Sequence, residues 1–81
     1  MPQVAAHSTV TIPRSGDGDR TLTLAEVDGP SAFMVSDAVI RVGPPMLTGP
    51  RAAGSRPVRV PRNMSVLIEN LGDHPIDWTI A

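Results

Sequence analysis

The sequence predicts an all-β fold: a small antiparallel β-sandwich or partly open β-barrel with an extended N-terminal arm and a long Gly/Pro/Arg loop. Six or seven short runs alternate apolar and polar residues with period two, and clusters of Gly, Pro and Asp separate them. Seven Gly and nine Pro in 81 residues suit many short strands joined by turns. The best helical candidate, residues 32–42, is rich in β-branched Val and Ile and lacks capping residues, which favours strands there too.

The N-terminal segment Met1–His7 has little pattern. We expect it to be an arm that becomes ordered only when something covers it, while residues 8–81 form a single small β domain. In this interpretation the arm lies on another chain, where its backbone donors and acceptors find partners.

Two alternating runs follow, Ser8–Ile12 and Thr21–Leu24, on either side of a Gly/Asp-rich connection. This arrangement predicts an antiparallel hairpin. The apolar residues of both runs are expected on one buried face; they are Val10, Ile12, Leu22 and Leu24.

The middle of the chain predicts two more strands and a loop. Ser31–Ser36 holds Phe33, and Ala38–Val42 is a second β-branched run that ends at a Gly-Pro-Pro sequence. The stretch Gly43–Arg56 is rich in Gly, Pro and Ala, so we expect one long exposed loop. Loops of this length in small domains are usually functional or become ordered on binding.

The C-terminal third predicts the last strands. Val58–Val60 and Val66–Leu71 are short β-patterned runs, and Ile76–Ile80 alternates again up to the end of the sequence. Trp78 should share one face with its apolar neighbours two positions away. It is either a core anchor of this strand or a contact across a subunit boundary, where Trp is enriched.

Residues with catalytic or metal-binding potential are few. The chain has no Cys and two His, too few for a closed zinc site unless carboxylates or a second chain complete it. Asp17 and Asp19 alternate with Gly, but the loop lacks the other ligands of a calcium-binding EF-hand and is explained by its turn. His74 lies between Asp73 and Asp77 on what we expect to be an exposed turn, without a nucleophile motif. We therefore expect no enzymatic activity, cofactor, metal or small-molecule substrate.

The charged residues point to protein partners. Seven Arg balance eight Asp and Glu, there is no Lys, and the net charge is −1, which gives no reason to expect a membrane surface as a partner. No acidic residue interrupts the basic cluster of Arg51, Arg56, Arg59 and Arg62. This cluster also lacks the aromatic platforms of a nucleic-acid groove. It is either a solvated loop or a docking loop for an acidic protein surface. Together with Trp78, its four arginines are the candidate partner-binding residues.

Composition also favours association. An 81-residue chain without disulfides and with two aromatic residues is near the lower limit for a self-sufficient core, so we expect a homo-oligomer or a subunit of a larger protein assembly. Small virion accessory subunits, of the capsid decoration or cement type, share this general profile. The expected role is therefore a structural, non-enzymatic one through surface and strand-edge contacts. The alternative is a monomeric OB- or SH3-like module that binds a ligand or nucleic acid. Since no signal peptide or membrane-spanning run is visible, the expected location is the virion or the cytoplasm.

Overall fold

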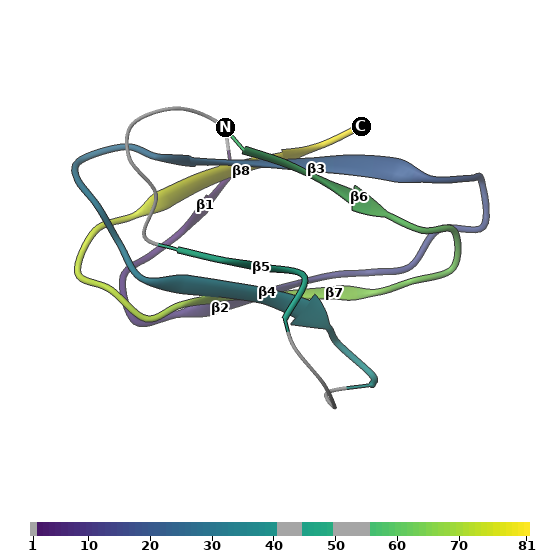
Figure 1. Ribbon diagram of the computed structural model, residues 1–81, viewed down its shortest axis with the longest axis horizontal. Coiled ribbons are helices and arrows are strands. Elements are labelled where there is room, and N and C mark those ends of the chain that lie inside the picture. Colours follow the sequence, from purple (N-terminus) through teal and green to yellow (C-terminus); the bar gives the residue numbers. More distant parts are fainter. Residues whose placement is uncertain (1, 41–44, 50–55) are drawn as a thin grey trace.

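Two antiparallel sheets pack face to face in the computed structural model, which describes residues 2–40, 45–49 and 56–81 (Figure 1). Within these ranges the strands are β1 (Gln3–Val4), β2 (Thr9–Ile12), β3 (Arg20–Glu26), β4 (Phe33–Asp37), β5 (Leu47–Thr48), β6 (Arg56–Val60), β7 (Val66–Asn70) and β8 (Ile76–Ile80). The all-β prediction is confirmed, and the architecture is a sandwich. Among the described residues no helix is long and apolar enough to cross a membrane.

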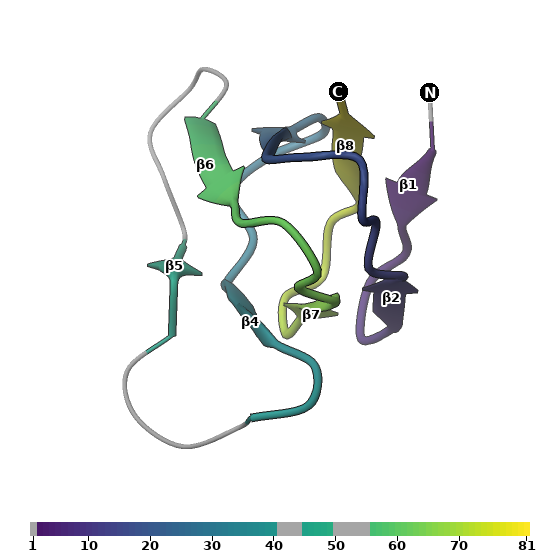
Figure 2. The same cartoon turned by 90° about the vertical axis from the view of Figure 1, so that its right-hand side faces the viewer.

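Each sheet has four strands. The order in sheet A is β1-β8-β3-β6, and in sheet B it is β2-β7-β4-β5. Viewed along the strands, β1 lies above β2 at one side of the sandwich and β6 lies above β5 at the other (Figure 2). Consecutive strands therefore often lie in different sheets, and every pair of neighbours within a sheet is antiparallel.

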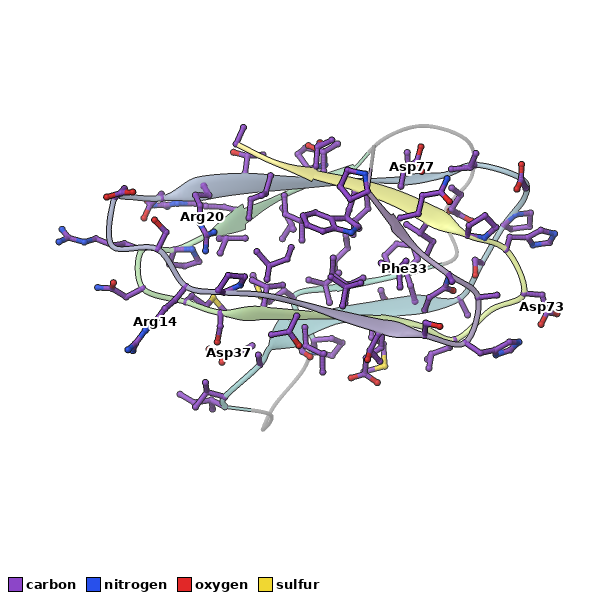
Figure 3. The ribbon with its side chains drawn as sticks, turned by 180° about the vertical axis from the view of Figure 1, so that it is seen from behind. Arg14, Arg20, Phe33, Asp37, Asp73 and Asp77 are labelled. Carbon is purple, nitrogen blue, oxygen red and sulfur yellow. The ribbon has the colours of Figure 1, made fainter. Side chains whose placement is uncertain are left out.

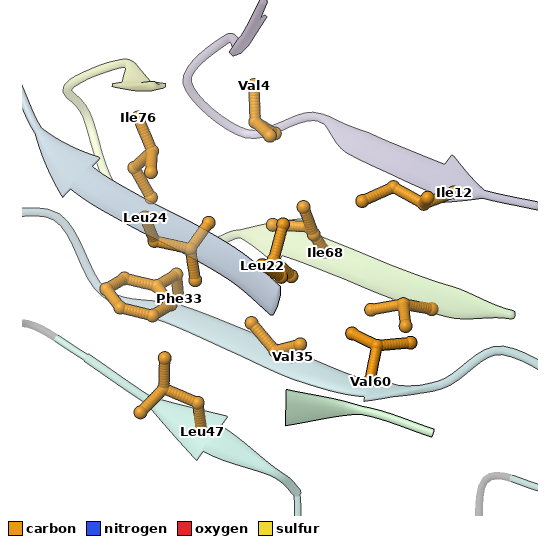
Figure 4. Close-up of a cluster of buried hydrophobic side chains, with 11 residues drawn as sticks. Val4, Ile12, Leu22, Leu24, Phe33, Val35, Leu47, Val60, Ile68 and Ile76 are labelled. Atoms are coloured by element: carbon orange, nitrogen blue, oxygen red, sulfur yellow. The ribbon is translucent and has the colours of Figure 1, made fainter. Parts of the chain in front are cut away.

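Aliphatic side chains from both sheets fill the space between them (Figure 4). The buried apolar residues are Val4, Ile12, Leu22, Leu24, Phe33, Val35, Leu47, Val60, Val66, Ile68 and Ile76. Phe33 is their single aromatic member, and the other members are Val, Ile and Leu. Fully burying one such side chain stabilises the fold by roughly 1.5–3 kcal/mol.

The predicted hairpin of Ser8–Ile12 with Thr21–Leu24 is wrong. β2 pairs with β7 in sheet B, whereas β3 lies between β8 and β6 in sheet A. The residues between β2 and β3 therefore cross from one sheet to the other. Ile12, Leu22 and Leu24 are buried as expected, and Val10 packs against the same core, because the two sheets face a common interior.

The expected N-terminal arm is not confirmed. Gln3 and Val4 pair with β8 of the same chain, and the Trp78 backbone N–H donates to the Pro2 carbonyl at 3.0 Å. Val4 is completely buried and belongs to the core. Part of the Met1–His7 segment is thus built into sheet A.

The middle of the chain differs from the expected strand and loop. Phe33 and Val35 lie on β4 as predicted, but residues 38–40 are not a strand, and the remainder of the Ala38–Val42 run lies outside the described residues. Within the Gly43–Arg56 stretch, Leu47 is buried in β5 and Arg56 begins β6. The long loop is therefore not confirmed, and residues 43–44 and 50–55 of that stretch lie outside the described residues.

The three C-terminal strands are confirmed. β6 begins two residues before the predicted run, β7 ends one residue before the end of its run, and β8 matches its run. Ile76 is buried, and Trp78 and Ile80 pack against the core from the same side of β8. The period-two pattern predicted this shared face correctly.

Candidate interaction surface

The turns of the sandwich gather at its two ends. We call the end formed by turns 13–19, 38–40 and 61–65 the tip end, and the end formed by turns 5–8, 27–32 and 71–75 the histidine end. In Figure 3, Arg14 and Asp37 lie toward the first end and Asp73 lies at the other. The two ends differ in their exposed apolar side chains and in their polar contacts.

At the tip end, a turn after β4 presents two apolar side chains to solvent. Val39 is 79% exposed and Ile40 is 66% exposed, the highest values among the exposed large hydrophobic residues of the described chain. The turn extends away from sheet B in Figure 1. Residues 38–40 are called the Val39–Ile40 tip below.

Asp37 holds this tip in place. Its carboxylate oxygen Oδ1 accepts hydrogen bonds from the backbone N–H groups of Ile40 at 3.0 Å and Val39 at 2.8 Å, and these bonds lower the pKa of Asp37 below its usual value. The Ala38 N–H donates to the Ser65 carbonyl at 3.0 Å, which ties the start of the tip to the neighbouring turn. An Asp that accepts from the residues two and three positions later forms a local turn that competes with strand extension.

A second carboxylate organises the basic residues of the same end. Asp19 Oδ2 accepts hydrogen bonds from Arg59 Nε, at 3.0 Å, and from Arg59 Nη2, while Asp19 Oδ1 accepts from the backbone N–H of Arg62 at 2.9 Å. These contacts lower the pKa of Asp19, and Asp19 in turn raises the pKa of Arg59. The sequence shows no acid within the basic cluster, but the fold places Asp19 beside it.

The Arg20 side chain connects turns 13–19 and 61–65. Its Nη2 donates to the carbonyl oxygens of Pro13 at 3.1 Å and Met64 at 3.2 Å. The Asn63 N–H also donates to the Ser15 carbonyl at 2.9 Å. Turns 13–19 and 61–65 are therefore joined by several bonds and form an ordered rim at the tip end.

The predicted partner-binding residues fall into three groups. Arg59 and Arg62 lie exposed at or near the tip end, on the same carboxylate. Trp78 is half-buried against the core, and its indole N–H has no hydrogen-bond partner among the described residues. Arg56 pairs through its backbone with Leu24, but its side chain and Arg51 lie outside the described structure.

The histidine end uses its polar side chains for structural contacts. His7 Nε2 lies 2.7 Å from Asp73 Oδ1 in an exposed pair, and His74 Nδ1 lies 3.0 Å from the Pro30 carbonyl. Gly29 packs so closely on the His74 ring that a Cβ there would come within 3.2 Å of it. Within the described ranges, no group of three or more His, Asp and Glu residues could hold a metal ion.

Sequence reasoning missed the Val39–Ile40 tip, because β-branched residues after a strand suggest another strand. The available signal was Asp37, since an Asp at the end of an apolar run often starts a turn. No family model, curated protein or solved structure matches this chain.

Proposed function

We propose that this protein is a non-enzymatic structural subunit that docks through its tip end onto a larger protein assembly, as a small virion accessory protein of the capsid decoration or cement type. The observation that carries this proposal is the Val39–Ile40 tip. This ordered turn exposes two β-branched apolar side chains. Covering them with a partner is favourable, because it removes apolar surface from water.

The tip is also fixed before any partner binds. The two hydrogen bonds to Asp37 restrict the backbone of Val39 and Ile40, so little conformational entropy remains to be lost on docking. Preorganised apolar anchors are typical of the centre of an interface.

Charged residues lie on other turns of the same end. Arg14 and Arg62 are exposed on turns of the same end, and Arg59 lies beside Asp19. A polar rim around apolar anchors is the usual anatomy of a protein interface, and Arg is favoured there because its planar fork binds carboxylates with two hydrogen bonds. The partner surface should therefore combine an apolar depression with acidic residues at its margin.

The experiment is a co-sedimentation assay with the particle or large complex from the source organism. The variant Val39→Ser/Ile40→Ser should reduce binding by at least roughly tenfold, because both apolar anchors are lost. The control is Val27→Ser/Leu71→Ser, which removes two exposed apolar side chains of the histidine end, where Val27 is 46% exposed and Leu71 is 52% exposed. This control should bind like the wild-type chain.

The same assay separates the alternatives. Equal binding by both double variants would show that the tip is not the docking site. A wild-type chain that sediments with no particle, stays monomeric and binds oligonucleotides or a small ligand would overturn the proposal in favour of the monomeric binding module.

A further inference from the structure

The edge strands in the described part of the sandwich differ in how well they are protected. β1 and β5 have two residues each, and β6 contains Pro57. β2 is four residues long and contains neither a proline nor a charged residue. Exposed edge strands can pair with another chain, and proteins usually block them by shortness, charge or proline.

The hydrogen-bond pattern shows which backbone groups of β2 point outward. The Asn70 N–H donates to the Ser8 carbonyl at 2.9 Å, and every second pair along this ladder is bonded in the same way. Val10 and Ile12 therefore direct their backbone groups toward β7. Thr9 and Thr11 direct theirs away from the sheet.

The pairing of β7 with its other neighbour, β4, supports this orientation of the β2 backbone. The Leu71 N–H donates to the Ala32 carbonyl at 2.7 Å, and the Ala38 N–H donates to the Ser65 carbonyl at 3.0 Å. Both bonds continue the register between β4 and β7. The backbone N–H and C=O groups of the odd-numbered residues of β7 therefore point toward β4. Those of its even-numbered residues point toward β2.

The edge strand β6, at the other side of the sandwich, is less available for pairing. Thr21 and Ala81 exchange hydrogen bonds at 2.8 and 3.0 Å, so Leu22 and Leu24 direct their backbone toward β6. The outward-facing residues of β6 are then Pro57 and Arg59. Because Pro57 has no N–H, β6 offers a single outward donor, whereas β2 offers two donors and two acceptors.

We propose that β2 is a pairing edge for a second copy of this chain. The two β2 strands run antiparallel about a two-fold axis through Val10, with Thr9 of each copy opposite Thr11 of the other. The four-stranded B sheets of the two copies then form one continuous sheet. This inference goes beyond the proposed function and does not depend on it, because β2 and the Val39–Ile40 tip are different surfaces.

The strand favours a second copy because its pattern is symmetric about Val10. Each copy has one outward N–H and one outward C=O on either side of that residue, so the two-fold arrangement satisfies all of them with hydrogen bonds between Thr9 and Thr11. Thr–Thr pairs are favourable across strands, and the uncharged edge brings no like charges together. The half-buried Val10 side chains also meet across the axis and become better covered.

The first test is the oligomeric state of two variants at the same residue. Thr11→Pro removes an outward N–H that makes no ladder bond, so β2 keeps its pairing with β7, whereas the control Thr11→Val keeps the N–H and the β-branched shape. Analytical ultracentrifugation over a concentration series should show dimers for the wild-type chain and Thr11→Val. Thr11→Pro should weaken the dimer by at least roughly tenfold, because two of the four intermolecular bonds are lost.

The second test reads the register and does not depend on that variant folding. The chain has no Cys, so single cysteines report contacts directly. Val10→Cys should form an intermolecular disulfide readily, because the two residues 10 face each other in a pair whose Cβ atoms are about 4.5–5.5 Å apart. Thr9→Cys is the control, since its counterpart lies two residues out of register.

Three outcomes would overturn the proposal: a wild-type chain that is monomeric at every concentration, a Thr11→Pro dimer as tight as the wild-type dimer, or equally fast cross-linking of Thr9→Cys and Val10→Cys. A monomer that pairs β2 with an extended segment of another protein falls under the first outcome. None of these results bears on the docking of the tip, which is tested separately by co-sedimentation.

Discussion

At the residue scale, one buried amide joins four segments of the chain. Asn70 is 1% exposed; its Nδ2 donates to the carbonyls of Val4 at 3.0 Å and His74 at 2.8 Å. Its Oδ1 accepts from Ser31 Oγ at 2.6 Å and from the Gly72 N–H at 3.1 Å. Both donors and both acceptor positions of the amide are thus used, which offsets the cost of burying it.

Removing this amide should therefore be costly. Asn70→Ala leaves two carbonyls, a hydroxyl and an N–H without their partner, so we expect a loss of about 3 kcal/mol of unfolding free energy. Thr79→Ala, on an exposed position of β8, is the control and should change stability by less than about 0.5 kcal/mol. Urea denaturation followed by Trp78 fluorescence measures both. A loss below 1 kcal/mol for Asn70→Ala would mean that water replaces the amide.

Gly72 is required because neighbouring atoms approach its Cα too closely to leave room for a side chain. A Cβ at this position would lie 2.1 Å from Ser31 Oγ and 2.8 Å from the Ala32 backbone nitrogen. Since the backbone cannot move aside without breaking the Leu71–Ala32 hydrogen bond, Gly72→Ala should lower the Tm by roughly 10 °C or more. At Gly16 a Cβ would meet Asn63 Oδ1 at an ordinary 3.4 Å, so Gly16→Ala is the matched control. Similar Tm values for the two variants would show that the turn relaxes.

At the element scale, the sequence predicts strands better than it predicts their partners. Alternation correctly places Leu22 and Leu24, and also Ile12, toward the interior. It does not tell whether two runs share a sheet, because both sheets of a sandwich point their apolar faces at one core. The Gly/Asp-rich connection suggested a hairpin, but it carries the chain across the core to the other sheet, and β2 pairs with β7 instead.

The candidate site was predictable only in part. Arg59 and Arg62 were candidates from their spacing, but their meeting at Asp19 depends on a contact between residues 40 or more positions apart. Such contacts have no local pattern in a single sequence. The Val39–Ile40 tip was missed because its local pattern is misleading. Its β-branched residues resemble a strand, but the Asp37 carboxylate accepts a backbone hydrogen bond there and forms a turn instead.

Acid should loosen the tip end first. Asp19 and Asp37 both have lowered pKa values in the folded chain, so the unfolded chain binds protons more readily there. Their contribution to stability is therefore present above the ordinary Asp pKa of about 3.9 and is lost as the pH falls through their lower folded values. Asp19→Asn/Asp37→Asn should show a shallower decline in Tm between pH 5 and pH 2 than the wild-type chain, in scans with about 0.5-unit pH steps. Parallel declines would show that other carboxylates control acid unfolding.

At the scale of the whole molecule, the chain closes its sandwich with its own ends. The radius of gyration is 11.8 Å, close to the roughly 12 Å of a compact domain of this length. β1, at the start of the chain, pairs with β8, at its end. The N-terminal residues therefore belong to the fold, which changes the expected effect of removing them from weaker association to lower stability.

Val4 tests this conclusion. It is completely buried beside Ile76, which is its register partner on β8, and its carbonyl accepts the Asn70 amide. Val4→Ala leaves that carbonyl in place and removes only the apolar side chain. We expect a loss of about 2 kcal/mol, which corresponds to roughly 10 °C in Tm for a domain of this size.

Gln3→Ala is the matched control, because Gln3 lies on the same two-residue strand with an exposed side chain. It should leave the Tm within roughly 2 °C of the wild-type value. Differential scanning calorimetry at two protein concentrations separates the fold from association, since a Tm set by self-association rises with concentration. If Val4→Ala changes only the concentration dependence and leaves the Tm of the dilute chain unchanged, the N-terminal segment acts as an arm for a neighbour. A lower Tm at both concentrations would establish that β1 is an integral strand of sheet A.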